Sequence, residues 1–120
     1  MSRKDKDVQA IGESGEERAL EYLSSRGLKP IARNYHCKGG ELDLVMLDGT
    51  TLALIEVRLR SSDSHGGAAA SITPAKQKRI IIAAKHLLLT RKDLARYRAR
   101  FDVVAIDGEK LEWIRDAFRL

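Results

Sequence analysis

Two carboxylates, Asp43 and Glu56, are the residues of this sequence best placed to do chemistry together. Each interrupts an apolar run, Leu42–Leu47 in one case and Leu52–Leu59 in the other, and the intervening Asp48–Thr51 segment is typical of a β-hairpin turn. Two acids in facing apolar strands repel each other, and a divalent cation removes that repulsion. We therefore expect Mg²⁺ or Mn²⁺ here, because both accept carboxylate oxygens.

The register of the hairpin decides whether the acids meet. If Leu47 pairs with Leu52, the two acids lie opposite each other and Glu41 lies opposite Arg58. Side chains alternate along a strand, so all four charged groups then share one face at the end away from the turn. A shift of two residues keeps them on that face, whereas a shift of one or a bulge separates them.

Ordinary strand-end salt bridges are the alternative explanation. Glu41 could pair with Arg58, and Glu56 with Arg58 or Arg60. This alternative leaves unexplained why two acids enter apolar strands on one face, where buried carboxylates are costly unless they are paired or bound to metal.

Length and composition favour one soluble domain. The chain has 120 residues and a net charge of +5, and it contains a single cysteine, Cys37. We expect a flexible segment over residues 1–11 and a single domain over 12–120. No stretch approaches the roughly 18 apolar residues of a membrane helix, so the expected location is the cytoplasm.

The remaining patterns predict an α/β fold. Residues 12–26 have helical spacing, with a possible capping box from Ser14 to Glu17 and a stop at Gly27. Thr73-Pro74 predicts the start of a second helix. The expected order is helix, three strands, helix and two strands, with the helices flanking a mixed five-stranded sheet. The predicted strands are 31–36, 42–47, 52–59, 101–106 and 110–114.

Basic residues gather between Arg91 and Arg100, around Tyr97. The plain interpretation is a solvated helix end or loop. The alternative is contact with a nucleic-acid backbone, in which Arg96 and Arg98 would bind phosphates.

The motifs resemble a known family. Glu41-Leu-Asp43 followed after a hairpin by Glu56-Val-Arg58 resembles the PD-(D/E)xK nuclease motif, with arginine where lysine is expected. The whole chain is similar to the YraN family of small uncharacterised bacterial proteins. The matching motifs are Gly12-x-x-Gly15-Glu16-x-x-Ala19, Arg33-Asn34-Tyr35, Gly40-Glu41-Leu-Asp43-Leu, Glu56-Val-Arg58-x-Arg60, Lys76, Arg100-Phe101-Asp102-Val103-Val104 and Ala117-Phe118.

That family is similar in fold to archaeal Holliday-junction resolvases. The resemblance implies a restriction-endonuclease-like core, dependence on Mg²⁺ and a DNA substrate, with branched DNA and a homodimer suggested by the same analogy. It assigns Asp43 and Glu56 as metal ligands and Glu16 as a third acid. Glu16 also precedes the apolar stripe of the first helix by one turn, so it is expected to face the sheet, although a contact with the helix dipole would explain it equally well.

Other candidates carry weaker expectations. Lys76 and Arg60 are candidate phosphate contacts, and a solvent-facing position is the plainer account for Lys76. Asp102 is expected to be a structural partner, and His65 an exposed loop residue.

The expected reaction is hydrolysis of a phosphodiester. Arginine remains charged at any relevant pH, so Arg58 could stabilise the phosphate but could not act as a base. Three functions remain open: an active nuclease, a weakly active or inactive DNA-binding module, and a protein-interaction domain.

Overall fold

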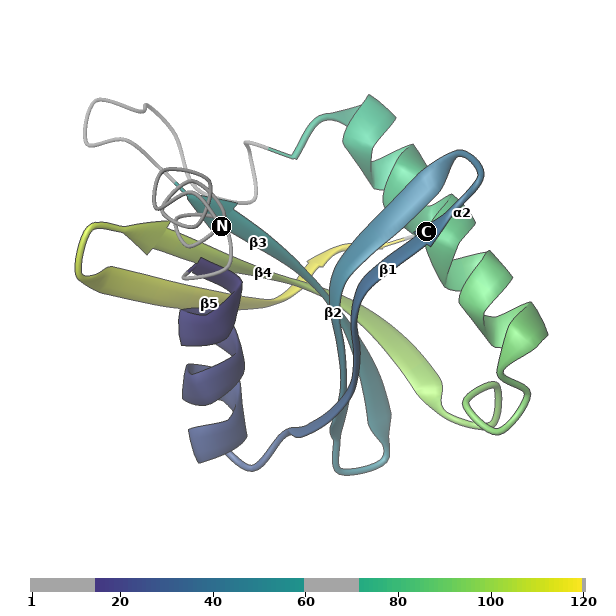
Figure 1. The fold of residues 1–120 in the computed structure, drawn as a ribbon, viewed down its shortest axis with the longest axis horizontal. Helices are drawn as coiled ribbons and strands as arrows, with labels where there is room; N and C mark the ends of the chain where they lie inside the picture. The colour runs from purple at the N-terminus through teal and green to yellow at the C-terminus, as the bar shows by residue number, and fades with distance from the viewer. Residues whose placement is uncertain (1–14, 60–71, 120) are drawn as a thin grey trace, which may run out of the picture.

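Five strands form one mixed sheet in the order β1-β2-β3-β4-β5. The computed structural model describes residues 15–59 and 72–119, and Figure 1 shows the arrangement. Only β3 and β4 are parallel, and the chain between them contains the helix α2. The strands are β1 (Lys29–Cys37), β2 (Gly40–Asp48), β3 (Thr51–Leu59), β4 (Arg98–Asp107) and β5 (Lys110–Phe118).

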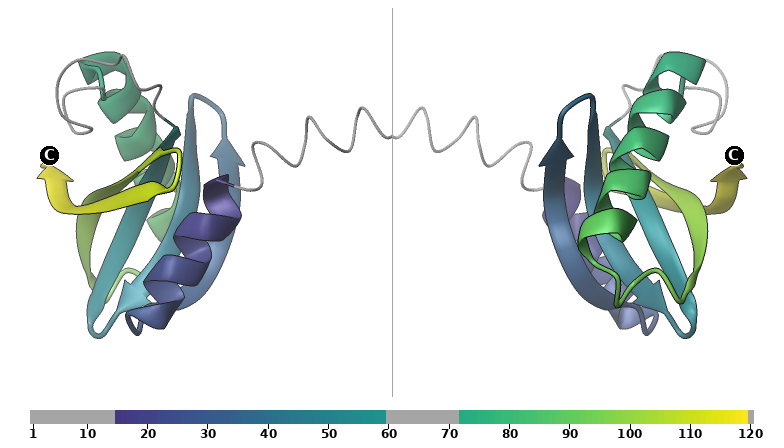
Figure 2. Two further views of the ribbon diagram at one scale, coloured as in Figure 1. Left: turned by 90° about the vertical axis from the view of Figure 1, so that its left-hand side faces the viewer. Right: turned by 90° about the vertical axis from the view of Figure 1, so that its right-hand side faces the viewer.

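One helix covers each face of the sheet. The first helix, residues 15–25, packs Ala19 and Leu23 against one face, and α2 (Pro74–Thr90) packs Ile80 and Leu87 against the other. Figure 2 shows the sheet between the two helices. The predicted α/β fold with a mixed five-stranded sheet flanked by helices is confirmed, and it is compatible with a restriction-endonuclease-like core.

The sequence correctly predicts where the first helix stops and where α2 starts. Gly27 follows the first helix with a φ of 95°, a conformation that glycine adopts without strain. The Thr73 side chain accepts a hydrogen bond from the Lys76 backbone N–H, and Pro74 occupies the first turn of α2. Several predictions fall outside the described residues: the capping box at Ser14, the expected flexible segment 1–11, Arg60 and His65.

The β2–β3 hairpin has the predicted register. Leu47 pairs with Leu52, and the pairing continues to Leu44 opposite Ile55. Gly49 supplies the positive φ, 63°, that the tight turn needs.

Beyond Leu44 and Ile55 the two strands separate, and we call this point the fork. From there β2 remains paired with β1 as far as Gly40, whereas β3 remains paired with β4 as far as Leu59. Figure 1 shows β1 and β2 diverging from β3 and β4 above the fork. Asp43 and Glu56 are the first residues past it.

One detail of the hairpin differs from expectation. Strict alternation predicts Leu42 on the face of Leu44 and Met46, but Leu42 packs in the core on the α2 side together with Val45. Gly40 also faces α2, because a Cβ there would lie 2.3 Å from the Arg79 carbonyl oxygen. The alternation of side chains between the two faces of β2 is therefore broken near the fork.

No helix within the described residues has the length and apolar character needed to cross a membrane.

Candidate metal centre

At the fork, the Asp43 side chain accepts a hydrogen bond that a backbone carbonyl would accept in a continuous strand pair. Its Oδ2 accepts a hydrogen bond of 2.8 Å from the Val57 backbone N–H. The neighbouring strands no longer exchange backbone hydrogen bonds here, so the carboxylate satisfies an amide that would otherwise lack its partner. Asp43 is thus held beside the start of the diverging half of β3.

Glu56 is a buried acid with one oxygen lacking a partner. The residue is only 5% exposed, and its Oε1 lies 3.3 Å from Lys76 Nζ. Its Oε2 is buried and accepts no hydrogen bond from any residue that the structure describes. Such an atom costs free energy unless a proton, a water or a cation satisfies it.

The charge state of Glu56 reflects this burial. Burial and the neighbouring charge of Asp43 together raise the pKa of Glu56 to about 7, against the opposing effect of Lys76. With its pKa raised in this way, Glu56 holds its proton to a higher pH than a free glutamate does. A divalent cation in the same position would replace that proton.

Lys76 links the two sides of the fork. Its Nζ donates to Glu41 Oε1 at 3.0 Å, on β2, and approaches Glu56 on β3. The hydrogen bond to Lys76 lowers the pKa of Glu41. Burial lowers the pKa of Lys76, but its hydrogen bond to Glu41 and the charge of Glu56 outweigh that effect and raise it. The lysine is therefore a permanent cation of the site.

Three elements meet in this cluster of Glu41, Asp43, Glu56 and Lys76, which we call the fork cluster. Lys76 reaches it from the first turn of α2, whose distance from β2 is set by Gly40. The acids supply only oxygen ligands, the donors that Mg²⁺ and Mn²⁺ prefer. The unsatisfied Oε2 of Glu56 beside Asp43 fits a divalent cation.

Glu16 belongs to the same end of the sheet. A Cβ on Gly15 would lie 2.9 Å from Leu59, so the helix begins against the end of β3. Glu16 itself, 19% exposed, lies 3.8 Å from Arg33 of β1. Within residues 15–59 and 72–119, no three His, Cys, Asp or Glu side chains form a group able to hold a metal. The structure thus joins Asp43 with Glu56, and Glu16 as a third ligand stays a prediction.

Asp102 is a structural partner, as predicted. It is 1% exposed and accepts hydrogen bonds from Arg100, from the Trp113 indole and from the Asp116 backbone N–H. Arg100 also donates to Asp48, so its guanidinium bridges two acids. These contacts tie β4 to β5 and to the hairpin turn.

The basic stretch forms a turn and the start of β4. Arg91 pairs with Asp93, and Arg96 stacks over the Tyr97 ring with its guanidinium carbon 4.9 Å from the ring centroid. Arg98 is exposed. The structure places Arg96 and Arg98 on the surface, whereas it places Lys76 inside the fork cluster.

The comparisons with known proteins agree on one family. The Uncharacterised protein family UPF0102 matches residues 15–106. This chain belongs to that family. It is the YraN family, and the predicted membership is confirmed.

Several UPF0102 proteins are similar over almost their whole length. The one from Herminiimonas arsenicoxydans is 53% identical over 109 residues, covering 91% of this chain and 86% of the relative. The one from Ralstonia pickettii is 55% identical over 114 residues, covering 91% and 90%. The one from Cupriavidus taiwanensis is 57% identical over 113 residues, covering 92% and 83%.

The sequence did not predict the position of Lys76 in this UPF0102 protein. Its place in the first turn of a helix favoured a solvent-facing lysine or a phosphate contact. A glycine at position 40 is the one local signal, because it allows the α2 backbone to approach β2. Gly40 alone does not predict the position of Lys76, because the sequence does not show that α2 packs on β2.

Proposed function

We propose that this protein is a divalent-metal-dependent DNA endonuclease of the PD-(D/E)xK class. The observation that carries the proposal is the pair of Asp43 and Glu56 at the fork, with an unsatisfied carboxylate oxygen between apolar strands. Glu56 has the ammonium of Lys76 beside one of its oxygens, whereas Arg100 binds both oxygens of Asp102. A buried carboxylate whose second oxygen stays unsatisfied among the described residues is suited to a cation.

Asp43 and Glu56 would hold the metal, with Glu16 as the proposed third ligand. When bound, Mg²⁺ or Mn²⁺ would activate the attacking water and neutralise charge that develops on the phosphate. The protein fixes the ligands in advance: Val57 orients Asp43, and Lys76 orients Glu56. This preorganisation reduces the cost of assembling the site.

Lys76 can perform the role of the lysine that the PD-(D/E)xK motif places at position 58 of β3. It brings an ammonium to within 3.3 Å of Glu56, from a helix rather than from position 58. An ammonium with three rotatable donors can orient a water or bind a phosphate oxygen. Arg58, two residues after Glu56, would then bind the phosphate without serving as a base.

The charge of the chain supports a polyanionic substrate. It carries 22 lysines and arginines against 17 acids. Arg96 and Arg98, exposed near the start of β4, are the proposed backbone contacts. Branched DNA is the preferred substrate class by the resemblance to junction resolvases, and two copies of the chain would match a two-fold symmetric junction.

The test is cleavage of a four-way junction and of a linear duplex in Mg²⁺, in Mn²⁺ and in EDTA. Wild type should cut the junction only with metal. Asp43→Asn and Glu56→Gln should lose most of that activity while still binding the junction. The exposed Glu112→Gln on β5 is the matched control and should cut like wild type. Cutting in EDTA, or full activity in both variants, would contradict the proposal.

A DNA-binding module without strong catalysis is the second candidate. Lys76 and Glu41 already form an ion pair within the fork cluster, and Arg58 replaces the expected lysine. If wild type binds junctions and metal but cuts neither substrate, binding is the better description of its role.

A further inference from the structure

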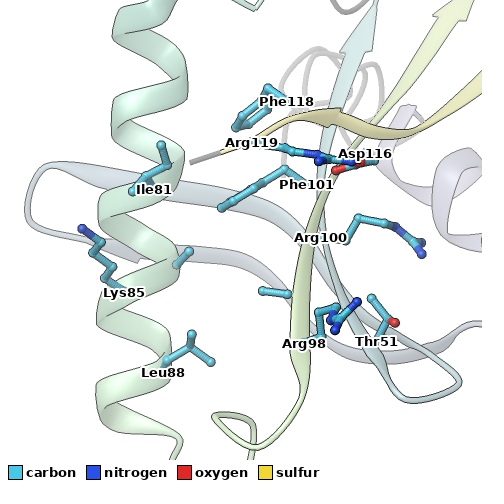
Figure 3. Close-up of a pocket in the computed structure, with 12 residues that line it drawn as sticks. Thr51, Ile81, Lys85, Leu88, Arg98, Arg100, Phe101, Asp116, Phe118 and Arg119 are labelled. Carbon is cyan, nitrogen blue, oxygen red and sulfur yellow. Dashed lines mark hydrogen bonds and ion pairs between the residues drawn. The ribbon is translucent and has the colours of Figure 1, made fainter.

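A cavity away from the fork cluster lies between α2 and the strands β4 and β5. Its volume is about 650 Å³, within the range of about 300–1,000 Å³ typical of small-molecule sites. Figure 3 shows residues from all three elements around it. We call it the α2 pocket.

The walls of the α2 pocket are apolar. Phe101 and Phe118 stack with ring centroids 4.9 Å apart and an angle of 16° between the ring planes. Figure 3 shows both rings projecting toward Ile81 on α2. Leu88, two turns further along the helix, extends this wall. Phe101 is buried beneath this stack, so the partly exposed ring of Phe118 is the aromatic surface of the pocket, beside the apolar Ile81 and Leu88.

The rim is basic. Lys85, Arg98, Arg100 and Arg119 line the pocket with one acid, Asp116. Arg119 is paired with Asp116, and Arg100 is held by Asp48 and Asp102. Neither Lys85 nor Arg98 forms an ion pair with any residue that the structure describes. The pocket thus joins an apolar, aromatic floor to two cations that lack an acidic partner there.

We infer that the α2 pocket takes an unpaired nucleotide of the DNA substrate, with the base against Phe118 and the adjacent phosphates at Lys85 and Arg98. A nucleotide has a flat apolar face and a negative charge at one end, which matches this distribution. Aromatic side chains beside basic ones are the usual means of binding single strands. An acidic peptide would match the rim but leave the aromatic floor without a stacking partner.

The position of the pocket connects it with the fork cluster. Both lie on the α2 side of the sheet, because Phe101 packs in the same core cluster as Ile80 and Leu87. Lys85 follows Lys76 along α2 by about 13 Å at the helical rise of about 1.5 Å per residue. A strand with one base in the pocket would pass the acids within a few nucleotides. This inference rests on the proposed function, and it makes an unpaired strand part of the preferred substrate.

The test measures binding without metal, so it does not depend on catalysis. A fluorescein-labelled blunt duplex and the same duplex with a single-stranded extension are titrated by anisotropy in EDTA. Wild type should bind the extended duplex more tightly by about 5- to 150-fold, the range expected of base–aromatic stacking. Equal affinities for the two duplexes would overturn the inference.

Ala99→Phe is the decisive variant. Ala99 lines the pocket and is exposed, so a phenyl ring there fills the cavity without removing a core contact. The variant should bind both duplexes equally, at the affinity of wild type for the blunt duplex. Ala95→Phe adds the same ring on the exposed turn outside the pocket and should keep the wild-type preference. A preference that survives Ala99→Phe would overturn the inference.

Two further measurements test the phosphate contact at Lys85 and the alternative that a second copy of the chain fills the pocket. Lys85→Ala should reduce the preference, whereas Lys92→Ala, an exposed lysine outside the pocket, should not. Sedimentation of wild type and Ala99→Phe tests another occupant: a dimer that becomes monomeric in the variant would show that a second copy fills the pocket, and would overturn the inference. A strand preference without cutting would leave the inference standing and reject the nuclease proposal alone.

Discussion

The ammonium of Lys76 lies 3.3 Å from Glu56 Oε1, which joins the first turn of α2 to the buried acid of β3. The same nitrogen lies 3.0 Å from Glu41 Oε1 on β2. A single cation therefore connects the two strands that separate at the fork. Charge balance in the fork cluster therefore depends on this lysine.

Lys76→Met should destabilise the metal-free protein, because Glu56 loses its nearby cation. Breaking a partly buried ion pair of this kind costs about 1–3 kcal/mol in the free energy of unfolding. Urea unfolding at pH 8 in EDTA measures it, with Lys78→Met, an exposed lysine of the same helix, as control. Mg²⁺ should restore more stability to Lys76→Met than to wild type. Equal stability of the two variants would contradict the role of Lys76.

Stability should fall as the pH rises from about 4.5 to about 7 and above. The folded protein raises the pKa of Glu56 from 4.5 to about 7, so it binds more protons than the unfolded chain in this window. This contribution is fully present below pH 4.5 and is lost through the folded pKa. Its size is of the order of 3 kcal/mol.

Glu56→Gln isolates that contribution, because glutamine stays neutral and can donate to Asp43. The variant should match wild type near pH 4.5 and exceed it in the free energy of unfolding at pH 8 in EDTA. Urea unfolding at the two pH values gives the difference. A variant less stable than wild type at both pH values would show that the ionised Glu56 carboxylate does not destabilise the folded protein.

Metal binding should require Asp43. Isothermal titration of Mg²⁺ and Mn²⁺ into wild type at pH 8 should give heats that Asp43→Asn lacks. Asparagine can still accept the hydrogen bond from Val57, so the fold should persist. Glu112→Gln should bind like wild type. Identical heats from wild type and Asp43→Asn would reject Asp43 as a ligand.

Affinity for DNA should depend steeply on salt. Each phosphate contact contributes a slope of about 0.9 log units per tenfold change in salt for duplex DNA. Replacing Arg96 and Arg98 with alanine should reduce this slope by the contribution of up to about two phosphate contacts. The matched control replaces Arg26 and Arg115, which stack on Tyr22 and Trp113. A slope unchanged by the Arg96 and Arg98 pair would mean that these residues are only a solvated surface.

Arg58→Lys should raise Mg²⁺-dependent cleavage of a junction above wild type. Lysine is a smaller point charge that can position a water beside the acids, whereas the planar guanidinium of arginine binds a carboxylate or phosphate through two hydrogen bonds. The rates of wild type, Arg58→Lys and Arg58→Lys with Glu56→Gln are compared on one substrate. If no residue at 58 supports metal-dependent cutting, the nuclease proposal gives way to a binding role.

The sequence was sufficient for most of the fold. Alternating apolar runs, a glycine in each tight turn and the Thr73-Pro74 start signal predicted the order of the helices and strands. These are local properties, since side-chain period and backbone preference depend on near neighbours. The register of the hairpin followed in the same way, because the turn and the buried face of its strands allow few pairings.

The sequence by itself also determined that Asp43 and Glu56 would be neighbours, since a hairpin links them through a short turn. Only the tertiary structure decided the rest of the fork cluster. Strict alternation failed at Leu42, and Lys76 reached the acids from a helix that follows Glu56 by a long stretch of chain. Both depend on how closely α2 packs against Gly40, a contact between segments distant in sequence. Periodicity carries no information on such a distance, whereas packing fixes it to within an ångström.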